Sequence, residues 1–274
     1  MEPLVSVIIP VYNTGATACA LVDKMLHKST YKNVEIILVD DGSQDDSLER
    51  LKEIKSRKVK VFAKQNGGPS SARNYGIEHA SGDYFLFVDS DDDVNIHFVE
   101  KLVEEMRKPD TALAVTSVRY RKVALNSSEA VWTDKIERRK NESTKSFVLR
   151  CLLYDGRMYS AYNKIFAADV VRAHKVCFDE KVHFGEDTKF TLDYLKFAKG
   201  EIRFVLEPLY TYYFGTETSL ATRGGVVWKN WALCYKNLRD WMGKKISLRD
   251  RATLLTLKTK WRVGCLRMAW RAKK

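Results

Sequence analysis

The feature that most constrains this chain is a run of short apolar segments that alternate with helical stretches over its first 110 residues. The apolar segments predict four strands: Leu4–Pro10, Val34–Val39, Val59–Ala63 and Asp83–Val88. The stretches between and after them predict four helices: Ala16–Lys28, Asp45–Ser56, one whose cap is Ser70 or Ser71, and one over about Ile96–Met106. Apolar strands with helices between them indicate an α/β fold on a parallel sheet covered on both faces. Ligands bind such sheets at the carboxyl ends of the strands, where this chain places its polar residues.

After Pro109 the pattern changes. It predicts three strands and two helices: Ala112–Tyr120, Ile202–Val205 and Leu209–Phe214, then Ser143–Leu153 and Glu186–Ala198. The polar segment Asn126–Glu142 is expected to be a loop, and only helices are predicted from Val226 onward, the last over Leu248–Lys274. We therefore expect a body over residues 1–219, divided near residue 110, and a helical extension over residues 220–274.

The net charge of +12 is concentrated in that extension. Residues 243–274 hold eleven Lys or Arg and one acid, Asp250, whereas the other 242 residues hold 36 basic and 34 acidic residues. The charge thus says little about the body, and without a recognition module in the sequence we expect no nucleic-acid partner. Three roles stay open for the extension: packing on the body or on a second subunit as a homo-oligomer, docking on an anionic membrane, or a solvated surface. Its main apolar stripe at helical spacing comprises Leu254, Leu257, Trp261, Cys265 and Met268.

Composition and cysteine usage indicate a soluble protein of a reducing compartment. The hydrophobic fraction of 45% and the charged fraction of 30% are typical of a globular chain. Five cysteines without a Cys-x-x-Cys pair predict lone buried thiols rather than disulfides or a zinc site. Pro10 and Gly15 interrupt the uncharged stretch Leu4–Val22, which we interpret as a strand, a turn and a helix start rather than a membrane span or signal peptide. We expect a cytoplasmic protein, with peripheral contact to the inner face of the cell membrane as the alternative.

Four carboxylates follow the fourth predicted strand, in the run Asp89-Ser90-Asp91-Asp92-Asp93. They repel one another unless a cation lies among them. An Asp-x-Asp pair in extended chain can turn both carboxylates toward one Mg²⁺ or Mn²⁺, which keeps other positions open for phosphate oxygens. The alternative is an acidic loop in which Asp92 or Asp93 caps the next helix.

The second predicted strand ends in Asp40-Asp41-Gly42-Ser43. One carboxylate can accept hydrogen bonds from a base or a ribose, while Gly42 can form a tight turn with a positive φ. The first strand leads into Tyr12, whose ring can stack on a base, although a tyrosine at such a position is more often a packing residue.

The segment Asn66-Gly67-Gly68-Pro69 is a glycine-rich turn that runs into a helix containing Arg73. Backbone N–H groups at a helix start attract anions, and an arginine in the first turn can fork onto phosphate oxygens. The Gly-Lys-Ser/Thr of a P-loop is absent, and a surface turn with a solvated arginine is the alternative.

The segment Gly185-Glu186-Asp187 places two carboxylates at the start of a predicted helix. One of them can act as a general base toward an incoming hydroxyl group. The alternative is a cap or a favourable interaction with the helix dipole.

In this order the motifs resemble those of the family 2 glycosyltransferases, inverting enzymes of the GT-A fold. The matching segments are Val5–Asn13, Val39–Ser43, Asn66–Asn74, Asp89–Asp92, Tyr162–Phe166, Gly185–Asp187 and Leu209–Tyr213. The likeness covers about residues 4–220, and the four N-terminal motifs together are highly specific. It implies a Rossmann-like mixed sheet flanked by helices, with a nucleotide-binding half over residues 1–110 and an acceptor-binding half over residues 111–219.

The resemblance also implies roles for individual residues. Those of the nucleotide-sugar site would be Pro10, Tyr12, Asn13, Asp40, Asp41, Asn66, Gly67, Arg73, Asp89 and Ser90. A Mn²⁺ or Mg²⁺ ion would be held by Asp89 and Asp91, and the catalytic base would be Asp187. The acceptor and diphosphate side would comprise Asn163, Lys164 and Glu186. Tyr162 replaces the Trp that many members carry, so the acceptor-stacking role of that Trp does not transfer directly.

The reaction implied is transfer of a sugar from a UDP-sugar to a hydroxyl of a glycan: a cell-surface polysaccharide, a lipid-linked oligosaccharide or a protein-attached glycan. One base is sufficient, because a nucleoside diphosphate leaves readily once a cation and Arg73 offset its charge. Two alternatives are a haloacid dehalogenase-like phosphatase and a non-catalytic nucleotide- or glycan-binding module on a degenerate transferase fold. The phosphatase usually needs a later Gly-Asp-x-x-x-Asp, which Gly185-Glu186-Asp187 does not match, and it leaves the upstream motifs unexplained.

Overall fold

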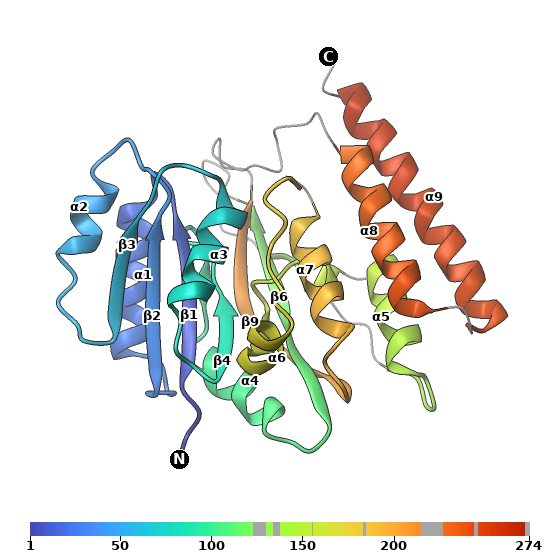
Figure 1. The fold of residues 1–274 in the computed structure, drawn as a ribbon, viewed down its shortest axis with the longest axis horizontal. Coiled ribbons are helices and arrows are strands. Elements are labelled where there is room, and N and C mark those ends of the chain that lie inside the picture. Colours follow the sequence, from blue (N-terminus) through green and yellow to red (C-terminus); the bar gives the residue numbers. More distant parts are fainter. Residues whose placement is uncertain are drawn as a thin grey trace.

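The structure is a computed structural model that describes residues 1–122, 130–133, 138–154, 156–182, 185–214, 227–243 and 246–271. A central sheet has helices on both faces, and two long helices stand side by side at the edge of the molecule farthest from the N-terminal strands (Figure 1). The N-terminus lies at the bottom of the view and the C-terminal end of α9 at the top (Figure 1).

The first 110 residues fold as alternating strands and helices, as the sequence predicts. The strands are β1 (Val5–Val11), β2 (Val34–Asp40), β3 (Val59–Ala63), β4 (Tyr84–Phe87) and the short β5 (Asp93–Val94). The helices are α1 (Gly15–His27), α2 (Ser47–Lys52), α3 (Pro69–His79) and α4 (Phe98–Met106). Helix α2 is shorter than predicted. The cap of α3 is Gly68, with φ 85°, rather than Ser70 or Ser71, because Pro69 already occupies the first helical position.

The remaining elements include both predicted and unexpected ones. The strands are β6 (Thr111–Lys122), β7 (Ala130–Thr133), β8 (Lys164–Ala167) and β9 (Glu201–Phe214). The helices are α5 (Thr144–Tyr154), the 3₁₀ turn η1 (Gly156–Met158), α6 (Ala168–Ala173), α7 (Glu186–Leu195), α8 (Val227–Met242) and α9 (Leu248–Arg271).

Two predictions for this second part are wrong. Residues 202–214 form one strand instead of two, because β9 continues along β6 through a register shift that lets the extra residues bulge near Pro208. Residues 126–142, expected to be a loop, contain β7, which pairs with β6. The expected boundary at residues 219 and 220 lies outside the described residues.

The strand order across the sheet is β3-β2-β1-β4-β8-β6-β9-β5, and β7 pairs with β6. Strands β3, β2, β1 and β4 pair in parallel, whereas β8 is antiparallel to both β4 and β6. Strands β6 and β9 are again parallel. The sheet is therefore mixed, as the family resemblance implies, and its first four strands direct their carboxyl ends to one edge.

Apolar side chains alternate between the two faces of the sheet. Ile8 and Phe87 belong to a buried cluster that includes residues of α3, α5, α7, α8 and α9. Val7 and Leu86 belong to a second cluster with residues of α1 and α4. Because both faces are covered, the polar groups of the central strands are confined to the strand ends.

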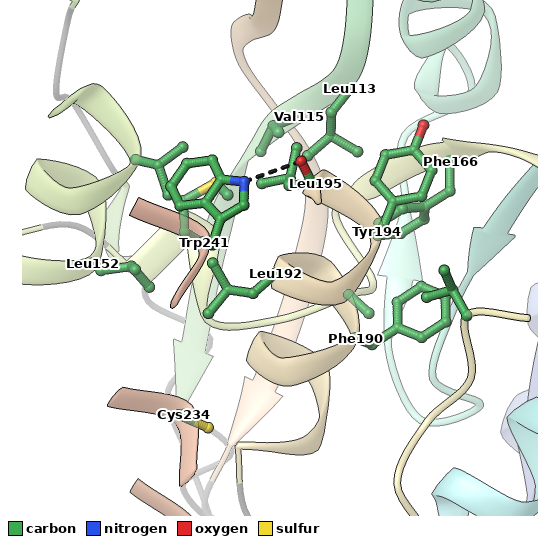
Figure 2. Close-up of a cluster of buried hydrophobic side chains, with 14 of the residues drawn as sticks. Leu113, Val115, Leu152, Phe166, Phe190, Leu192, Tyr194, Leu195, Cys234 and Trp241 are labelled. Carbon is green, nitrogen blue, oxygen red and sulfur yellow. Dashed lines mark hydrogen bonds between the residues drawn. The ribbon is translucent and has the colours of Figure 1, made fainter. Parts of the chain in front are cut away.

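Helices α8 and α9 pack on the body. Trp241 of α8 donates from Nε1 to the carbonyl oxygen of Leu195 at 3.0 Å, within a cluster that also holds Cys234 (Figure 2). Leu254 and Leu257 of α9 are buried, and Trp261 donates to Tyr159 Oη at 3.0 Å. Packing on the body, the first role left open for the extension, thus accounts for the described part of the predicted stripe. The side chains of Cys265 and Met268 lie outside it.

The four cysteines whose side chains the structure describes are free. Cys151 and Cys234 are buried and Cys19 is half-buried, but Cys177 is exposed, so the prediction of buried thiols is wrong for that residue. Within the described ranges, no helix combines the length and the apolar character needed to span a bilayer.

Candidate active site

The candidate site is built at the carboxyl ends of the parallel strands. The register places Val11, the last residue of β1, opposite Asp40, the last residue of β2. It places Ile8 opposite Phe87, the last residue of β4. The turns that follow these three strands therefore meet at one edge of the sheet, where parallel sheets bind ligands.

Asp41 holds the glycine-rich turn in place. Its buried carboxylate accepts the N–H groups of Gly67 at 3.0 and 3.2 Å and of Gly68 at 2.7 Å, and the ammonium group of Lys64 at 2.8 Å. Its carbonyl oxygen accepts a hydrogen bond from Asn66 Nδ2 at 2.8 Å. Asp41 and Asn66 thus direct polar atoms at the turn itself, which brings Gly67 to the edge of the sheet.

Asp40 offers a buried acceptor at the same edge. Its Oδ2 accepts the N–H of Ser43 at 3.2 Å, and Gly42 makes the tight turn with φ 73°, as predicted. Its Oδ1 is buried and has no hydrogen-bond partner among the described residues. Because buried polar atoms are normally paired, this oxygen suits a ligand that brings a donor, such as a base N–H or a ribose hydroxyl.

The turn after β1 lies beside the turn after β2. Asn13, with φ 55°, donates its N–H to Ser43 Oγ at 3.0 Å, and its Oδ1 accepts the N–H of Gln44 at 2.8 Å. Tyr12 is 44% exposed, so one face of its ring is available for stacking. Pro10 is half-buried at the end of β1.

Arg73 links the two halves of the site. It projects from α3, is 5% exposed, and donates from Nη2 to Asp89 Oδ1 at 2.6 Å and from Nη1 to Asp187 Oδ1 at 3.4 Å. Its guanidinium also lies over the ring of Phe178, 5.4 Å from the centroid. Asp187 accepts the N–H of Ala161 at 3.0 Å through Oδ2. The motif after β4 and the first turn of α7, 98 residues apart in sequence, therefore share one buried cation.

Burial and mutual repulsion shift the pKa values of these groups. Burial, and then the charge of Asp89, raise the pKa of Asp187, while Arg73 opposes the rise. Burial and the charge of Asp187 raise the pKa of Glu186 to about 7. Burial alone would lower the pKa of Arg73, but the three surrounding carboxylates outweigh it and raise that pKa. Raised carboxyl pKa values next to a fixed cation are characteristic of acid–base sites.

The acidic run after β4 divides into carboxylates with different tasks. Asp92 is buried and accepts Tyr210 Oη–H at 2.6 Å and the N–H of Tyr213 at 2.9 Å, and Tyr210 Oη in turn accepts the N–H of Asp89 at 3.1 Å. Asp91 is exposed and Asp89 is half-buried. Partial desolvation and the charge of Asp89 raise the pKa of Asp91. Asp93 forms an ion pair with Lys24 at 2.7 Å, so we expect Asp91, and Asp89 beside Arg73, to be the two carboxylates of this run that face a ligand.

The donor set of this run fits a divalent cation that is only partly held by protein. Within the described residues no group of three or more His, Cys, Asp or Glu side chains could hold a metal ion. Asp89 and Asp91 alone supply hard oxygen ligands, and Mg²⁺ or Mn²⁺ commonly binds one or two carboxylates together with phosphate oxygens and water. Ser90 instead contacts Thr14, with 2.7 Å between their hydroxyl oxygens, and ties this run to the turn after β1.

Asn163 and Lys164 lie beneath the site and not on its surface. Both side chains are fully buried. Asn163 Nδ2 donates to the carbonyl oxygen of Thr116 at 2.8 Å, and Lys164 Nζ donates to Asn163 Oδ1 at 2.8 Å and to the carbonyl oxygens of Arg157 and Ser160. They support the segment that carries the N–H of Ala161. Because both side chains are buried, neither contacts the space where a glycan acceptor would bind.

The structure brings together most of the residues that the sequence singled out, at one edge of the sheet. Sequence reasoning assigned no role to three contributors: Thr14, Phe178 and Tyr210. Tyr210 lay inside a matched segment, but nothing in its sequence indicated a hydrogen bond to Asp92. A tyrosine facing inward on a strand that borders an acidic run is the only signal that could have suggested it.

Comparison with known proteins identifies the family. The model of glycosyl transferase family 2 matches residues 6–174, more than half of the chain. Glycosyltransferase GlyG of Streptococcus pneumoniae is 41% identical over 118 residues, which are 42% of this chain and 39% of GlyG. The glycosyltransferase EpsJ of Bacillus subtilis is 31% identical over 217 residues, 77% of this chain and 61% of EpsJ. The chain thus spans less than two thirds of the length of these relatives.

Solved structures share the fold at low sequence identity. TarS of S. aureus in complex with UDP-GlcNAc has a TM-score of 0.71 and 20% identity, over 91% of this chain and 70% of that chain. The mannosyltransferase PcManGT of Pyrobaculum calidifontis, in complex with GDP-Man and Mn²⁺, has a TM-score of 0.58 and 13% identity, over 98% of this chain and 85% of that chain. The mixed sheet and its flanking helices are therefore those of a GT-A fold. The match of the family model over more than half of the chain shows that the chain belongs to glycosyl transferase family 2.

Proposed function

We propose that this glycosyltransferase moves a sugar from a UDP-sugar to a hydroxyl group of a glycan, with inversion at the anomeric carbon. The observation that carries the proposal is the buried cluster in which Arg73 joins Asp89 to Asp187. It supports a site where a diphosphate-binding cation and a base face the same point. The complexes of TarS with UDP and with UDP-GlcNAc favour a uridine nucleotide, and that of PcManGT with GDP-Man leaves a guanine nucleotide as the second choice.

Three features would hold the donor. The unpartnered Oδ1 of Asp40 would accept a hydrogen bond from the base or the ribose, and the exposed ring of Tyr12 would stack on the base. Gly67, at the start of the turn that Asp41 fixes, would let the diphosphate approach the backbone. Arg73 would then donate to the diphosphate oxygens.

Asp187 would act as the general base. The acceptor oxygen attacks the anomeric carbon from the face opposite the diphosphate, a new C–O bond forms, and the bond to the diphosphate breaks. The hydroxyl proton passes to Asp187, whose raised pKa makes it a better proton acceptor than an exposed aspartate. Glu186, beside it in the first turn of α7, would face the acceptor.

Asp89 and Asp91 would hold a Mn²⁺ or Mg²⁺ ion. Bound there, such an ion supplies positive charge that offsets the charge developing on the departing diphosphate. Asp92 would not take part, because Tyr210 and the backbone of Tyr213 already occupy its oxygens.

The acceptor is proposed to be a glycan of a surface polysaccharide, a lipid-linked oligosaccharide or a protein. The free thiols Cys151 and Cys234 are compatible with a reducing, cytoplasmic location. Membership of the glycosyltransferase family removes the phosphatase alternative. The remaining alternative, a non-catalytic binding module, is excluded if the protein turns over a sugar nucleotide.

The test is UDP release across a panel of sugar nucleotides, with Mn²⁺ or with EDTA. We expect turnover with one uridine nucleotide and loss of most activity with EDTA or in Asp91→Ala. Asp23→Ala is the matched control, because Asp23 lies two turns along α1 in an exposed pair with His27 and should leave turnover unchanged. Turnover that persists in Asp91→Ala with chelator would reject the metal role, and no turnover with any donor would favour the non-catalytic module.

A further inference from the structure

Helix α9 presents two apolar stripes on different sides. The inner stripe, Leu254, Leu257 and Trp261, is buried against the body. The outer stripe consists of Leu248, which is 84% exposed, and Leu255, which is 62% exposed; they are seven positions apart, nearly two helical turns, and so lie on one side of the helix. An apolar stripe facing water has no role in folding α9 onto the body.

Basic residues accompany the outer stripe. Arg249 and Arg251 are exposed, and by helical spacing they fall on its two sides. Lys258 instead lies with Nζ 5.4 Å from the centroid of the Tyr235 ring on α8. Over the described side chains of α9, the outer side therefore carries two exposed leucines beside basic residues.

The acid of residues 243–274 does not offset this charge on the outer side. Asp250, the single acid of this segment, accepts hydrogen bonds from Ser146 Oγ of α5 at 3.0 Å and Ser247 Oγ at 2.8 Å, so its carboxylate is engaged on the side of the body. Residues 243–274 carry a net charge of +10. Two copies of such a face would repel each other, which argues against self-association through it.

We infer that the outer stripe of α9, with Arg249 and Arg251, docks on the surface of an anionic lipid bilayer. Leucine side chains between basic residues are the arrangement by which a helix lies in the interfacial plane, its apolar stripe among the acyl chains and its cations at the head groups. Each basic residue adds attraction to a negatively charged leaflet, and this attraction weakens with salt. The inference concerns a surface apart from the proposed active site.

The orientation of α9 suits an enzyme that meets its acceptor at a membrane. Helix α9 extends along the side of the body, and its C-terminal end lies toward the end of the molecule to which β1 and β2 run (Figure 1). A bilayer along the outer side of α9 would therefore reach the level of the strand ends where the candidate site lies.

The experiment measures co-sedimentation of the full chain with vesicles of phosphatidylcholine alone and of phosphatidylcholine mixed with phosphatidylglycerol. We expect binding only to the anionic vesicles, weakened by added salt. The double variants Leu248→Glu/Leu255→Glu and Arg249→Glu/Arg251→Glu should each bind at least about tenfold more weakly. Most of these substitutions place acids in the first turn of α9, where the helix dipole favours them, so the fold is expected to hold.

Leu206→Glu is the matched control, because Leu206 is a 57% exposed leucine on β9, outside α9. It should bind vesicles within about twofold of the natural chain. Circular dichroism checks the fold of each variant. The inference is overturned if the natural chain ignores anionic vesicles, or if the α9 variants bind as well as Leu206→Glu. It is also overturned if light scattering shows a dimer that Leu248→Glu/Leu255→Glu dissociates. The assay needs no turnover, so its result is independent of the proposed function.

Discussion

The two halves of the sheet differ in how regularly their strands pair and in how far apart in sequence the paired strands are. In residues 1–110 strands pair in parallel with unbroken register, and each turn after a strand brings a polar group to the same edge. In residues 111–214 the long strand β6 pairs with β9, nearly a hundred residues further along, through several register shifts. The helices of this half bury their apolar faces against α8 and α9.

The difference teaches how the two halves serve one site. The first half supplies groups whose positions follow from strand ends and tight turns, such as Asp40 and Gly67. The second half supplies Asp187, whose position depends on α7 and therefore on the packing around Leu195 and Trp241 (Figure 2). Substitutions in the first half should alter donor binding and local stability. In the second half, substitutions at Asp187 should lower kcat, whereas substitutions at Trp241 should lower stability.

The largest expected effect is on catalysis in Asp187→Asn. The amide cannot take a proton, although it can still accept the N–H of Ala161, so kcat should fall about 10²- to 10⁴-fold while donor binding changes little. Single-turnover UDP release and donor titration measure the two quantities. Asp193→Asn, at the other end of α7 and paired with Lys189, is the control and should keep normal turnover. Activity of Asp187→Asn within threefold of the natural chain would remove this residue from the base role.

Asp41→Ala should produce the largest loss of stability. It leaves the N–H groups of Gly67 and Gly68 and the ammonium group of Lys64 without their shared acceptor, at a cost of about 3 kcal/mol. The KM for the donor should rise as the turn loosens. Urea unfolding and donor titration test both. An effect confined to stability would show that the turn does not contact the donor.

Glu186→Gln should stabilise the protein in a pH-dependent way. The folded-state pKa of about 7 lies above the ordinary value of 4.5, so the folded chain binds this proton more tightly than the unfolded chain. Ionisation of Glu186 therefore costs stability as pH rises from 4.5 to 7, and the cost persists above 7. The variant should be more stable by about 1–2 kcal/mol at pH 8 and nearly unchanged at pH 5, as measured by urea unfolding. An equal gain at both pH values would argue against the raised pKa.

The smallest effect is expected for Trp241→Phe. It removes the hydrogen bond to the carbonyl of Leu195 and part of the ring contact, which should cost about 1 kcal/mol, or a few degrees in Tm, with kcat within twofold. Tyr154→Phe, an exposed change on neighbouring α5, is the control for Tm. A large loss of kcat in Trp241→Phe would show that packing at the far end of α7 is coupled to the base at its start.

The sequence predicted the first half of the fold well because its signals are local. Val59–Ala63 was predicted with its observed bounds, and Gly42 adopts the positive φ expected of it. The second half was predicted less well because pairing decides it: β7 forms by pairing with β6, and β9 stays one strand because β6 is long enough to continue it.

For the candidate site, the residue types at strand ends were sufficient to identify most of the residues that meet there, but not to predict which are buried and which are exposed. The resemblance assigned a metal role to Asp91 and none to Asp92, without a physical reason for the difference. The contact with Tyr210 supplies it, because it marks Asp92 as the buried carboxylate and leaves Asp91 as the exposed one. Likewise, Asn163 and Lys164 gave no sign in sequence that they are fully buried. Such differences arise from tertiary contacts made by residues far away along the chain.

The single guanidinium shared by Asp89 and Asp187 also limits how the two halves can move. Separating the end of β4 from α7 would leave Asp89 or Asp187 without its ion pair to Arg73, at a cost of several kcal/mol. The halves should therefore not swing apart like a hinge to admit a sugar nucleotide. We expect the sugar nucleotide to enter instead beside the exposed side chains of Tyr12 and Asp91. The ion pairs of Arg73 with Asp89 and Asp187 would stay formed until the diphosphate replaces a carboxylate as the partner of Arg73.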